Sequence, residues 1–209
     1  NNDVRGVIKE LREDGSSFDV YINDEFYGNF NINIFGKHMI ENALACIYMA
    51  YLEGISKEDI TKYLNEFHGA KRRFSEEKIN DVVLVDDYAH HPNEVETVLK
   101  TARQKYPDKK LVPVLIPYTL SRTKAFYKDF ARVLKQADKV FVTDVEPARE
   151  DPNDFKGVTA DLIIKEIPNA EHISKEEISK LYKYKNAVIP FMGCKDPTWL
   201  IDAYKENLK

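Results

Sequence analysis

The stretch Val82-Val83-Leu84-Val85-Asp86-Asp87-Tyr88-Ala89-His90-His91-Pro92, which a helical pattern follows over residues 93–106, decides the fold of this chain. Residues 82–85 are consecutive apolar side chains bounded by polar ones, which predicts a short buried strand. Because the helical pattern follows directly, this region reads as the first half of a strand–helix–strand unit. Such units build parallel sheets, so an α/β fold is expected.

The same alternation continues to the end of the chain. The expected elements are strands over residues 111–116, 140–143 and 187–192 and helices over residues 121–137, 161–167, 176–184 and 198–208. Strands and helices that alternate at this spacing predict a mostly parallel sheet with helices on its faces.

The residues before this region follow another pattern. The expected elements there are strands over residues 4–11, 18–22 and 26–35 and helices over residues 39–51 and 56–67. Turn signals at Asp14-Gly15 and Asn23-Asp24 predict an antiparallel sheet. Ser56 and Asp59 form a capping-box pattern at the start of the second helix. The basic linker Lys71-Arg72-Arg73-Phe74 marks the expected boundary between two domains.

The composition excludes several classes of protein. Of 209 residues, 43% are hydrophobic and 32% are charged, which is typical of a soluble globular protein. No apolar run reaches the roughly 18–20 residues that span a bilayer. The net charge of −4 argues against general nucleic-acid binding. Cys46 and Cys194 alone provide no disulfide framework and favour a reducing compartment. The chain begins Asn-Asn-Asp without Met, so we expect either processing or a fragment of a longer protein.

A dense polar cluster occupies residues 86–91, where a predicted strand ends. Ligands of open α/β sheets bind at the carboxyl ends of the strands, so this cluster is a candidate site. The alternative is a solvated loop in which Asp87 or Asn93 caps the next helix. A metal site is disfavoured, because the adjacent His90 and His91 cannot easily both face one ion.

A second cluster, residues 117–123, also follows a strand and opens a helix. Backbone N–H groups at a helix start, beside Arg122, suit a carboxylate or a phosphate. The alternative is that Ser121 or Thr119 is an ordinary N-cap and that Arg122 is solvated.

Two further segments are weaker signals. The cations of residues 71–73 could clamp a nucleotide phosphate, although a charged hinge is the alternative. Gly193 permits a tight turn after the last strand. Cys194 in that turn could be a nucleophile, but a small turn residue is the simpler interpretation.

Five motifs, in this order, resemble those of the Mur ligase family, the ATP-dependent ligases that build the peptide of bacterial peptidoglycan. They are Gly36-x-His38-x-x-x-Asn42-Ala43-Leu44-Ala45, Phe67-x-Gly69-x-Lys71-Arg72-Arg73-Phe74, Asp86-Asp87-Tyr88-Ala89-His90-His91-Pro92-x-Glu94, Ser121-Arg122-Thr123-x-Ala125-Phe126 and Ala148-Arg149-Glu150. The strings Asp86–Pro92 and Lys71–Phe74 are the most specific, and the motifs run through almost the whole chain.

The resemblance implies a place for this chain within a three-domain enzyme. Residues 1–72 are then the C-terminal part of the central ATP-binding domain, and residues 73–209 are the Rossmann-like C-terminal Mur ligase domain, with a mostly parallel sheet. The chain contains neither G-x-x-x-x-G-K-[ST] nor G-x-G-x-x-G. The phosphate loop is therefore expected upstream, and the chain alone is not expected to be active.

The resemblance also implies roles for individual residues. It places the nucleotide at Asn42 (adenine), Arg73 and Asp87 (ribose). It places the amino acid and the reacting carboxylate at Tyr88, His90, Tyr118 and Arg122, with Arg122 and His90 as catalytic residues.

The implied reaction joins an amino acid, L-alanine in the most similar members, to the carboxylate of UDP-N-acetylmuramate through an acyl phosphate. Cations that stabilise the transferring phosphoryl group suit this chemistry. ATP and Mg²⁺ are implied, with the principal magnesium ligands upstream and none within this chain. The implied partners are the UDP-muramoyl substrate and the amino acid, without nucleic acid or membrane insertion, in the bacterial cytoplasm.

Three positions depart from the family pattern. Tyr118 stands in place of a histidine near the amino-acid site, Lys195 in place of a glycine in the last turn, and Met39 in place of an asparagine. These departures keep two alternatives open. One is a family member with another substrate, such as a murein-tripeptide recycling ligase. The other is a non-catalytic module that binds a nucleotide or a partner.

Overall fold

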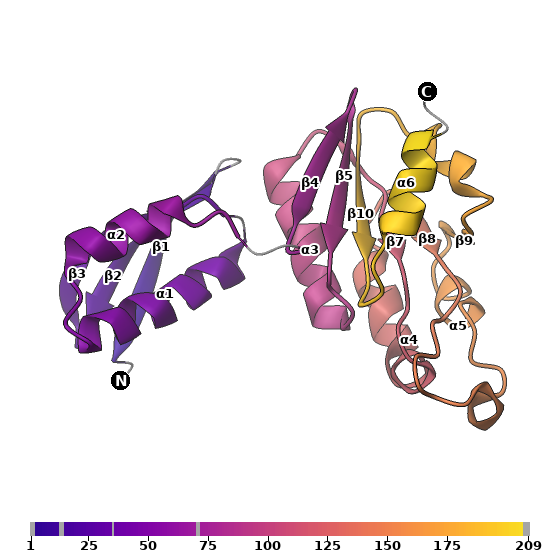
Figure 1. Cartoon of the computed structure of the whole chain (residues 1–209), viewed down its shortest axis with the longest axis horizontal. Helices are drawn as coiled ribbons and strands as arrows, with labels where there is room; N and C mark the ends of the chain where they lie inside the picture. The colour runs from indigo at the N-terminus through magenta and orange to yellow at the C-terminus, as the bar shows by residue number, and fades with distance from the viewer. Residues whose placement is uncertain (1–2, 13–14, 35, 70–71, 207–209) are drawn as a thin grey trace. The chain divides into compact units, whose positions relative to one another are not determined.

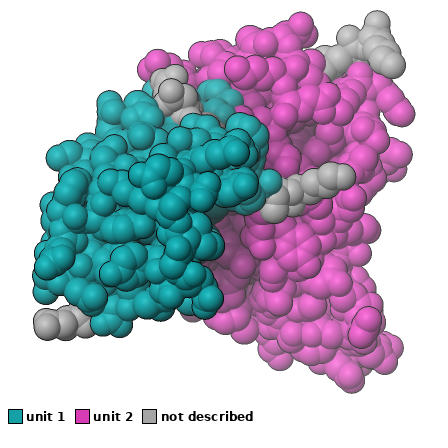
Figure 2. Space-filling model, turned by 60° about the vertical axis from the view of Figure 1, so that its left-hand side comes forward, with its two compact units in different colours: residues 1–70, 104–107 teal, residues 71–103, 108–209 magenta. Residues whose placement is uncertain are grey.

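The computed structural model describes residues 3–12, 15–34, 36–69 and 72–206, which form two compact units. Unit 1 comprises residues 1–70 with 104–107, and unit 2 comprises residues 71–103 with 108–209 (Figure 2). The change of unit, between residues 70 and 71, comes immediately before the predicted basic linker. Some predicted positions lie outside the described residues, namely Asp14 of the first turn, Phe35, Lys71 of the linker and Leu208.

Unit 1 is an antiparallel sheet packed against two helices. Its elements are β1 (Val4–Arg12), β2 (Gly15–Ile22), β3 (Glu25–Ile32), α1 (Lys37–Leu52) and α2 (Lys57–Glu66), with strand order β1-β2-β3. Phe18 and Phe30 form the sheet side of the core, and Ile47 packs against them from α1. All five predicted elements are therefore present.

Local signals explain how these elements are joined. Asn23 and Asp24 both have positive φ angles, 50° and 66°, as the tight turn between β2 and β3 requires. Ser56 caps α2, because its hydroxyl oxygen accepts the backbone N–H of Asp59 at 3.1 Å. Both features agree with the sequence prediction.

Unit 2 is a mostly parallel sheet with helices on its two faces. Its strands are β4 (Ser75–Ile79), β5 (Val82–Asp87), β6 (Lys110–Leu111), β7 (Val114–Leu115), β8 (Val140–Val142), β9 (Ala170–His172) and β10 (Ala187–Met192). The order is β4-β5-β10-β7-β8-β9, with β6 also on β10, and only the β4–β5 pair is antiparallel. The predicted α/β fold is confirmed.

The helices of unit 2 divide between the two faces. They are α3 (Pro92–Lys105), α4 (Leu120–Leu134), α5 (Asp161–Ile164) and α6 (Thr198–Glu206), with short 3₁₀ segments η1 (Pro152–Phe155) and η2 (Ile178–Leu181). Helix α6 covers one face of the sheet, and α3 and α4 cover the other (Figure 1). Leu200 and Tyr204 of α6 pack with Leu84 and Phe191 of the strands.

Some details of unit 2 differ from the prediction. Strand β4 has four exposed residues and no apolar alternation, so no strand was predicted there. Strand β9 was not predicted either, and it also has no buried residue. The predicted strand 111–116 is two short strands on either side of residues 112–113, which lie opposite Ile189 and Pro190 of β10, and Pro190 has no N–H to donate. The predicted helices 161–167 and 176–184 are only the single-turn segments α5 and η2.

Candidate active site

The carboxyl ends of the parallel strands β5, β10, β7 and β8 form one edge of the unit 2 sheet. Backbone hydrogen bonds hold the segments that leave these strands in register. They run from Gly193 N–H to Asp87 O (3.1 Å), from Ile116 N–H to Met192 O (2.8 Å) and from Thr143 N–H to Leu115 O (3.0 Å). The two predicted polar clusters, residues 86–91 and 117–123, therefore lie along the same edge of the sheet, where ligands of such folds bind.

The loops that follow β7 and β8 are joined to each other. The carbonyl of Glu146 accepts the Thr119 N–H, and the Glu146 N–H donates to Pro117 O, each at 2.9 Å. Tyr118 forms a parallel bridge with Glu146. The Glu146 carboxylate also pairs with Lys195 of the turn after β10. Three loops of the edge thus form one connected surface.

Asp87, the last residue of β5, is 5% exposed and accepts two backbone hydrogen bonds. Its carboxylate oxygens accept the N–H groups of Phe74 and Ala89, each at 2.8 Å. Burial raises the pKa of Asp87, and the two N–H groups and the charge of Arg73 oppose that rise. Each carboxylate oxygen has two lone pairs, so Asp87 retains acceptor capacity for a hydroxyl group such as that of a ribose.

Tyr88 projects from the loop after β5 with 37% of its surface exposed. The guanidinium carbons of Arg72 and Arg73 lie 5.2 and 5.6 Å from its ring centroid, within cation–π range. The His90 ring meets it edge to face at 5.2 Å. A hydrogen bond with the Cys194 thiol raises the pKa of Tyr88. Tyr88 thus lies at the centre of a cluster of predicted site residues.

His90 is oriented by groups of its own loop. Its Nδ1 lies 2.9 Å from the carbonyl of Tyr88 and 3.4 Å from Glu94 Oε2. A carbonyl oxygen only accepts, so Nδ1 donates and Nε2 is the acceptor of the neutral ring. Glu94 also accepts the backbone N–H groups of His90 and His91. Partial burial disfavours the Glu94 carboxylate, but these contacts outweigh it and lower its pKa.

The neighbouring His91 has a different environment. Its ring packs edge to face on Phe126 of α4, with centroids 4.9 Å apart, and its Nδ1 accepts the Asn93 N–H at 3.4 Å. Among the described residues, no three His, Cys, Asp or Glu side chains come together as a metal site. The two histidines therefore differ: the His90 ring has a nitrogen available to a ligand, whereas the His91 ring packs against Phe126.

Arg122 lies in the first turn of α4, half-buried. Its Nη1 donates to the carbonyl of Tyr118 at 3.2 Å, and its backbone N–H donates to the Thr119 hydroxyl at 3.3 Å. Thr119 is thus the N-cap of α4, with a φ of 66°. The capping alternative is correct for Thr119, but the Arg122 guanidinium is fixed to the loop rather than only solvated.

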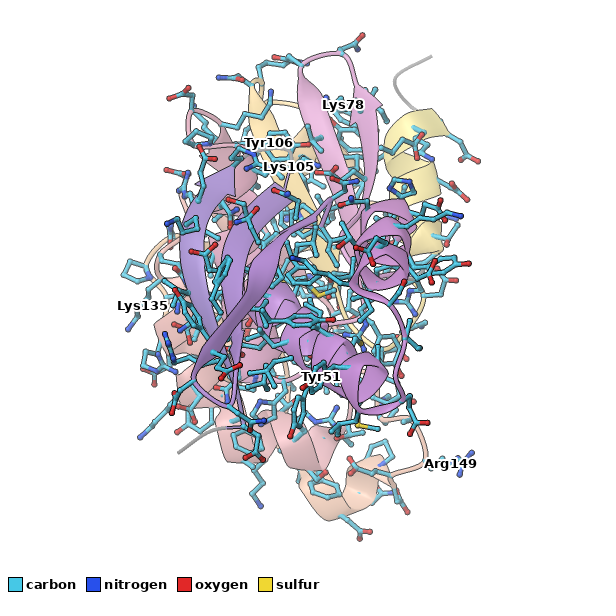
Figure 3. The ribbon with its side chains drawn as sticks, turned by 90° about the vertical axis from the view of Figure 1, so that its left-hand side faces the viewer. Tyr51, Lys78, Lys105, Tyr106, Lys135 and Arg149 are labelled. Carbon is cyan, nitrogen blue, oxygen red and sulfur yellow. The ribbon has the colours of Figure 1, made fainter. Side chains whose placement is uncertain are left out.

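The first turn of α4 already holds an anion. The Glu150 carboxylate accepts the Ser121 backbone N–H at 2.9 Å and the Ser121 hydroxyl proton. These bonds, with the charge of Arg122, lower the pKa of Glu150. The sequence predicts a carboxylate or phosphate ligand at this helix start, and in the structure the Glu150 side chain binds the Ser121 groups of that turn. The neighbouring Arg149 points outward from the loop (Figure 3).

The basic linker separates into residues with different roles. Arg72 donates hydrogen bonds to Asp86 and to backbone carbonyls, so its guanidinium has a structural role. Arg73 is exposed beside Tyr88 and opposite the charge of Asp87. Of these two cations, Arg73 suits a phosphate better.

Asn42, the predicted adenine contact, lies in unit 1. It is exposed on α1, and its side-chain amide donates a weak hydrogen bond to the Met39 sulfur at 3.8 Å. Its amide is therefore available to a ligand.

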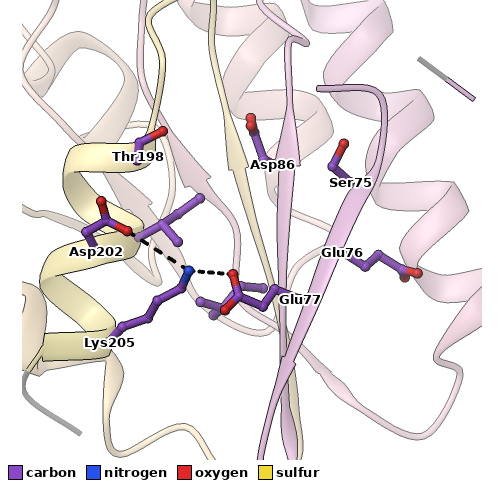
Figure 4. A pocket seen from close by; sticks show the side chains of 9 residues that line it. Ser75, Glu76, Glu77, Asp86, Thr198, Asp202 and Lys205 are labelled. Carbon is purple, nitrogen blue, oxygen red and sulfur yellow. Dashed lines mark ion pairs between the residues drawn. The ribbon is translucent and has the colours of Figure 1, made fainter. Parts of the chain in front are cut away.

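A separate hollow of about 250 Å³ lies beside α6 and strands β4 and β5 (Figure 4). Lys205 lies there between Glu77 and Asp202, at 2.5 and 4.0 Å. Asp86 also lines it and pairs with Arg72. These charges compensate one another, and Asp86 is the one residue of the predicted cluster 86–91 among the described residues that line the hollow, so it is not the candidate site.

Two residues of this edge had no role assigned from sequence. Glu94 stands third in α3, where a carboxylate commonly caps backbone N–H groups, so the capping pattern could have identified it. Glu146 lies in an irregular loop after β8, and its bonds to the Thr119 loop and to Lys195 depend on tertiary structure. No local pattern indicates it.

Comparison with known proteins agrees with these motifs. The profile of the family described as "Mur ligase, glutamate ligase domain" matches residues 72–193. The UDP-N-acetylmuramate–L-alanine ligase of Levilactobacillus brevis is 45% identical over 195 residues, covering 93% of this chain and 44% of the relative. That of Lactobacillus gasseri is 43% identical over 99% of this chain and 47% of the relative. The chain thus spans about half the length of the curated relatives it matches.

Solved structures share the fold. The UDP-N-acetylmuramate-alanine ligase MurC of Thermotoga maritima has a TM-score of 0.81 at 24% identity, covering 100% of this chain and 46% of that protein. MurF of Acinetobacter baumannii has a TM-score of 0.75 at 18% identity, covering 98% of this chain and 46% of that protein. At these identities the likeness concerns the fold.

Proposed function

Since the chain belongs to the Mur ligase family, we propose that it is part of an ATP-dependent ligase that adds L-alanine to UDP-N-acetylmuramate. The observation that carries this proposal is the overlap of two findings. The family profile covers residues 72–193, and within that range the predicted clusters 86–91 and 117–123 share one edge of the sheet. The relatives at 45% and 43% identity bear the name of that activity.

We propose that the chain is a portion of a longer enzyme, with residues 1–72 belonging to an ATP-binding domain and residues 73–209 to the C-terminal ligase domain. The chain aligns with less than half of the length of each of the two relatives, which supports this division. Unit 1 also carries most of the exposed large apolar side chains among the described residues, Tyr51 included (Figure 3). They are Val7, Ile8, Leu11, Phe26, Met49, Tyr51, Leu52, Ile55, Tyr63 and Phe67. Such a surface is typical of an interface with more protein.

Asn42 of unit 1 and, separately, Arg73 and Asp87 of unit 2 are each proposed to contact the nucleotide. The residues fit this group, because Asn42 presents an exposed amide, Arg73 an exposed cation and Asp87 spare acceptor lone pairs. ATP, when bound with Mg²⁺, would supply the phosphoryl group that activates the muramoyl carboxylate. The principal magnesium ligands are proposed to lie outside this chain.

The amino acid would be held by Tyr88, His90, Tyr118 and Arg122. The Arg122 guanidinium would attract the reacting carboxylate and stabilise negative charge on it. His90 has its Nδ1 bonded to the Tyr88 carbonyl, so its Nε2 lone pair would accept a proton from the incoming ammonium group. The resulting amine would attack the carbonyl carbon of the acyl phosphate. The C–N bond would form as the C–O bond breaks, and phosphate would leave with that electron pair and take up the second proton from the nitrogen.

We propose the bacterial cytoplasm as its location, where the UDP-linked substrate and ATP would both be available. Among the described residues, the helices lack the combined length and hydrophobicity that a membrane-spanning segment needs.

A substrate panel on the full-length enzyme tests this function. We expect ADP release that depends on UDP-N-acetylmuramate and L-alanine together. Release with a murein tripeptide in place of L-alanine would instead identify the recycling ligase, an alternative that the departure at Tyr118 keeps open. No substrate-dependent release, with nucleotide still bound, would identify a non-catalytic module.

A further inference from the structure

Arg72 binds the turn that follows strand β10. Its Nε donates to Asp86 Oδ1 (3.2 Å), its Nη1 to Cys194 O (3.1 Å), and its Nη2 to Gly193 O (2.8 Å) and Lys195 O (3.0 Å). Three of these acceptors are successive backbone carbonyls of one turn. A planar guanidinium can satisfy such a set, whereas the single nitrogen of a lysine cannot reproduce the geometry.

The backbone of Arg72 holds the neighbouring loop. Its carbonyl accepts the Tyr88 N–H at 3.0 Å, and its own N–H donates to the Ser75 hydroxyl at 3.0 Å. The guanidinium carbon also lies 5.2 Å from the centroid of the Tyr88 ring. One residue thus fixes both the start of the Tyr88 loop and the turn after β10.

The turn that Arg72 holds lies between the two loops proposed to bind the amino acid, because β10 is the strand between β5 and β7. On one side, the Gly193 N–H donates to the carbonyl of Asp87 at 3.1 Å, one residue before Tyr88. On the other side, Lys195 pairs with Glu146, whose backbone is bonded to the Thr119 segment. A shift of the turn would therefore move contacts on both sides of that site.

We propose that Arg72 is a positioning residue of the amino-acid site, which sets the spacing between the Tyr88 loop and the Tyr118 loop by clamping residues 193–195. The assignment to an amino-acid site rests on the proposed function; the clamp itself rests on the four side-chain hydrogen bonds. Arg72 makes no contact with substrate in this account. Its neighbour Arg73 is the residue proposed to contact the nucleotide.

The clamp is tested in this chain by the reactivity of Cys194. In a Cys46→Ser background, which removes the other thiol, the rate of alkylation by N-ethylmaleimide reports how often the turn opens. We expect Arg72→Gln to raise this rate about tenfold or more, and Arg72→Lys to raise it less. Arg103→Gln is the matched control, because Arg103 also bonds a carboxylate and a carbonyl, those of Asp138 and Lys109. Equal rates in all variants would overturn the clamp.

The positioning role is tested by steady-state kinetics of the full-length enzyme. We expect Arg72→Gln to raise the KM for the amino acid by about tenfold or more and to leave the KM for ATP nearly unchanged, with Arg72→Lys in between. Lower thermal stability with both KM values unchanged would reduce Arg72 to a structural residue and overturn the proposal. If the wild-type enzyme forms no amide product, the proposed function fails and this role fails with it. The alkylation rates then still decide whether Arg72 holds the turn.

Discussion

Glu150 holds the first turn of α4 through Ser121, accepting both its backbone N–H at 2.9 Å and its hydroxyl proton. The two residues are 29 positions apart in sequence, so the contact joins the loop after β8 to the helix that carries Arg122. A carboxylate at a helix N-terminus is favoured by the unpaired N–H groups and by the helix dipole. The anion that such a helix start attracts is here a permanent part of the protein.

This contact predicts a pH dependence of stability. The folded-state pKa of Glu150 is lowered by its bonds to Ser121, so the contact stabilises the fold above the ordinary glutamate pKa and is lost as the pH falls through the lowered value. Wild type should therefore lose more thermal stability than Glu150→Gln between about pH 5 and pH 3. Melting temperatures over this range measure the difference. Glu166→Gln, at an exposed carboxylate outside this contact, is the control, and parallel curves for wild type and Glu150→Gln would refute the argument.

Removal of the Asp87 carboxylate should destabilise unit 2. Asp87→Ala leaves the N–H groups of Phe74 and Ala89 without their acceptor, which should cost about 2–4 kcal/mol in the free energy of unfolding. Asp87→Asn keeps one acceptor oxygen and should cost less. Urea denaturation measures both values, with Asp129→Ala on the surface of α4 as the control. A loss below about 0.5 kcal/mol for Asp87→Ala would contradict this account.

Arg73 and Arg72 should differ in their effect on nucleotide binding. Arg73 is exposed and faces Asp87, so Arg73→Ala in the full-length enzyme should raise the KM for ATP by about tenfold or more with little change in the KM for the amino acid. Arg132→Ala, at an exposed arginine near the end of α4, should leave both values unchanged. An unchanged KM for ATP in Arg73→Ala would remove this residue from the nucleotide site.

Tyr118 should influence the choice of amino acid. It lies half-buried in the loop that Glu146 holds, and Arg122 is bonded to its carbonyl. Tyr118→His, which restores the residue that the family resemblance implies, should change the ratio of kcat/KM between L-alanine and a larger amino acid such as L-valine by about threefold or more, with the KM for ATP retained. Phe126→Leu on α4 is the control for altered packing. An unchanged ratio would show that the Tyr118 side chain does not contact the amino acid.

The sequence predicted most of the fold because long apolar strands and amphipathic helices carry their own pattern. Strand β10, for example, was predicted with its bounds from six consecutive apolar residues, and all six are buried in the structure. Strand β4 was not predicted, because an exposed edge strand has no such apolar pattern. Its position depends on pairing with β5. The predicted strand 111–116 is divided opposite Pro190 of β10, which has no N–H to donate across to it.

The candidate site was predictable only in outline. The motifs placed Asp87, Tyr88, His90 and Arg122 after strands, and the parallel sheet brings those strand ends to one edge. The partners of each side chain depend on residues far away in sequence. Arg72, for example, bonds carbonyls more than 120 positions away, which no local pattern indicates.

The central claim is that this chain belongs to a ligase that activates a muramoyl carboxylate and joins it to L-alanine. It is tested most directly with UDP-N-acetylmuramate labelled with ¹⁸O in its carboxylate, incubated with ATP, Mg²⁺, L-alanine and the full-length enzyme. In an acyl phosphate route, one carboxylate oxygen leaves with the phosphate when the amine attacks. We therefore predict one ¹⁸O atom in the inorganic phosphate for each UDP-N-acetylmuramoyl-L-alanine formed, as measured by mass spectrometry. Unlabelled phosphate, or no product that depends on L-alanine, would contradict the account.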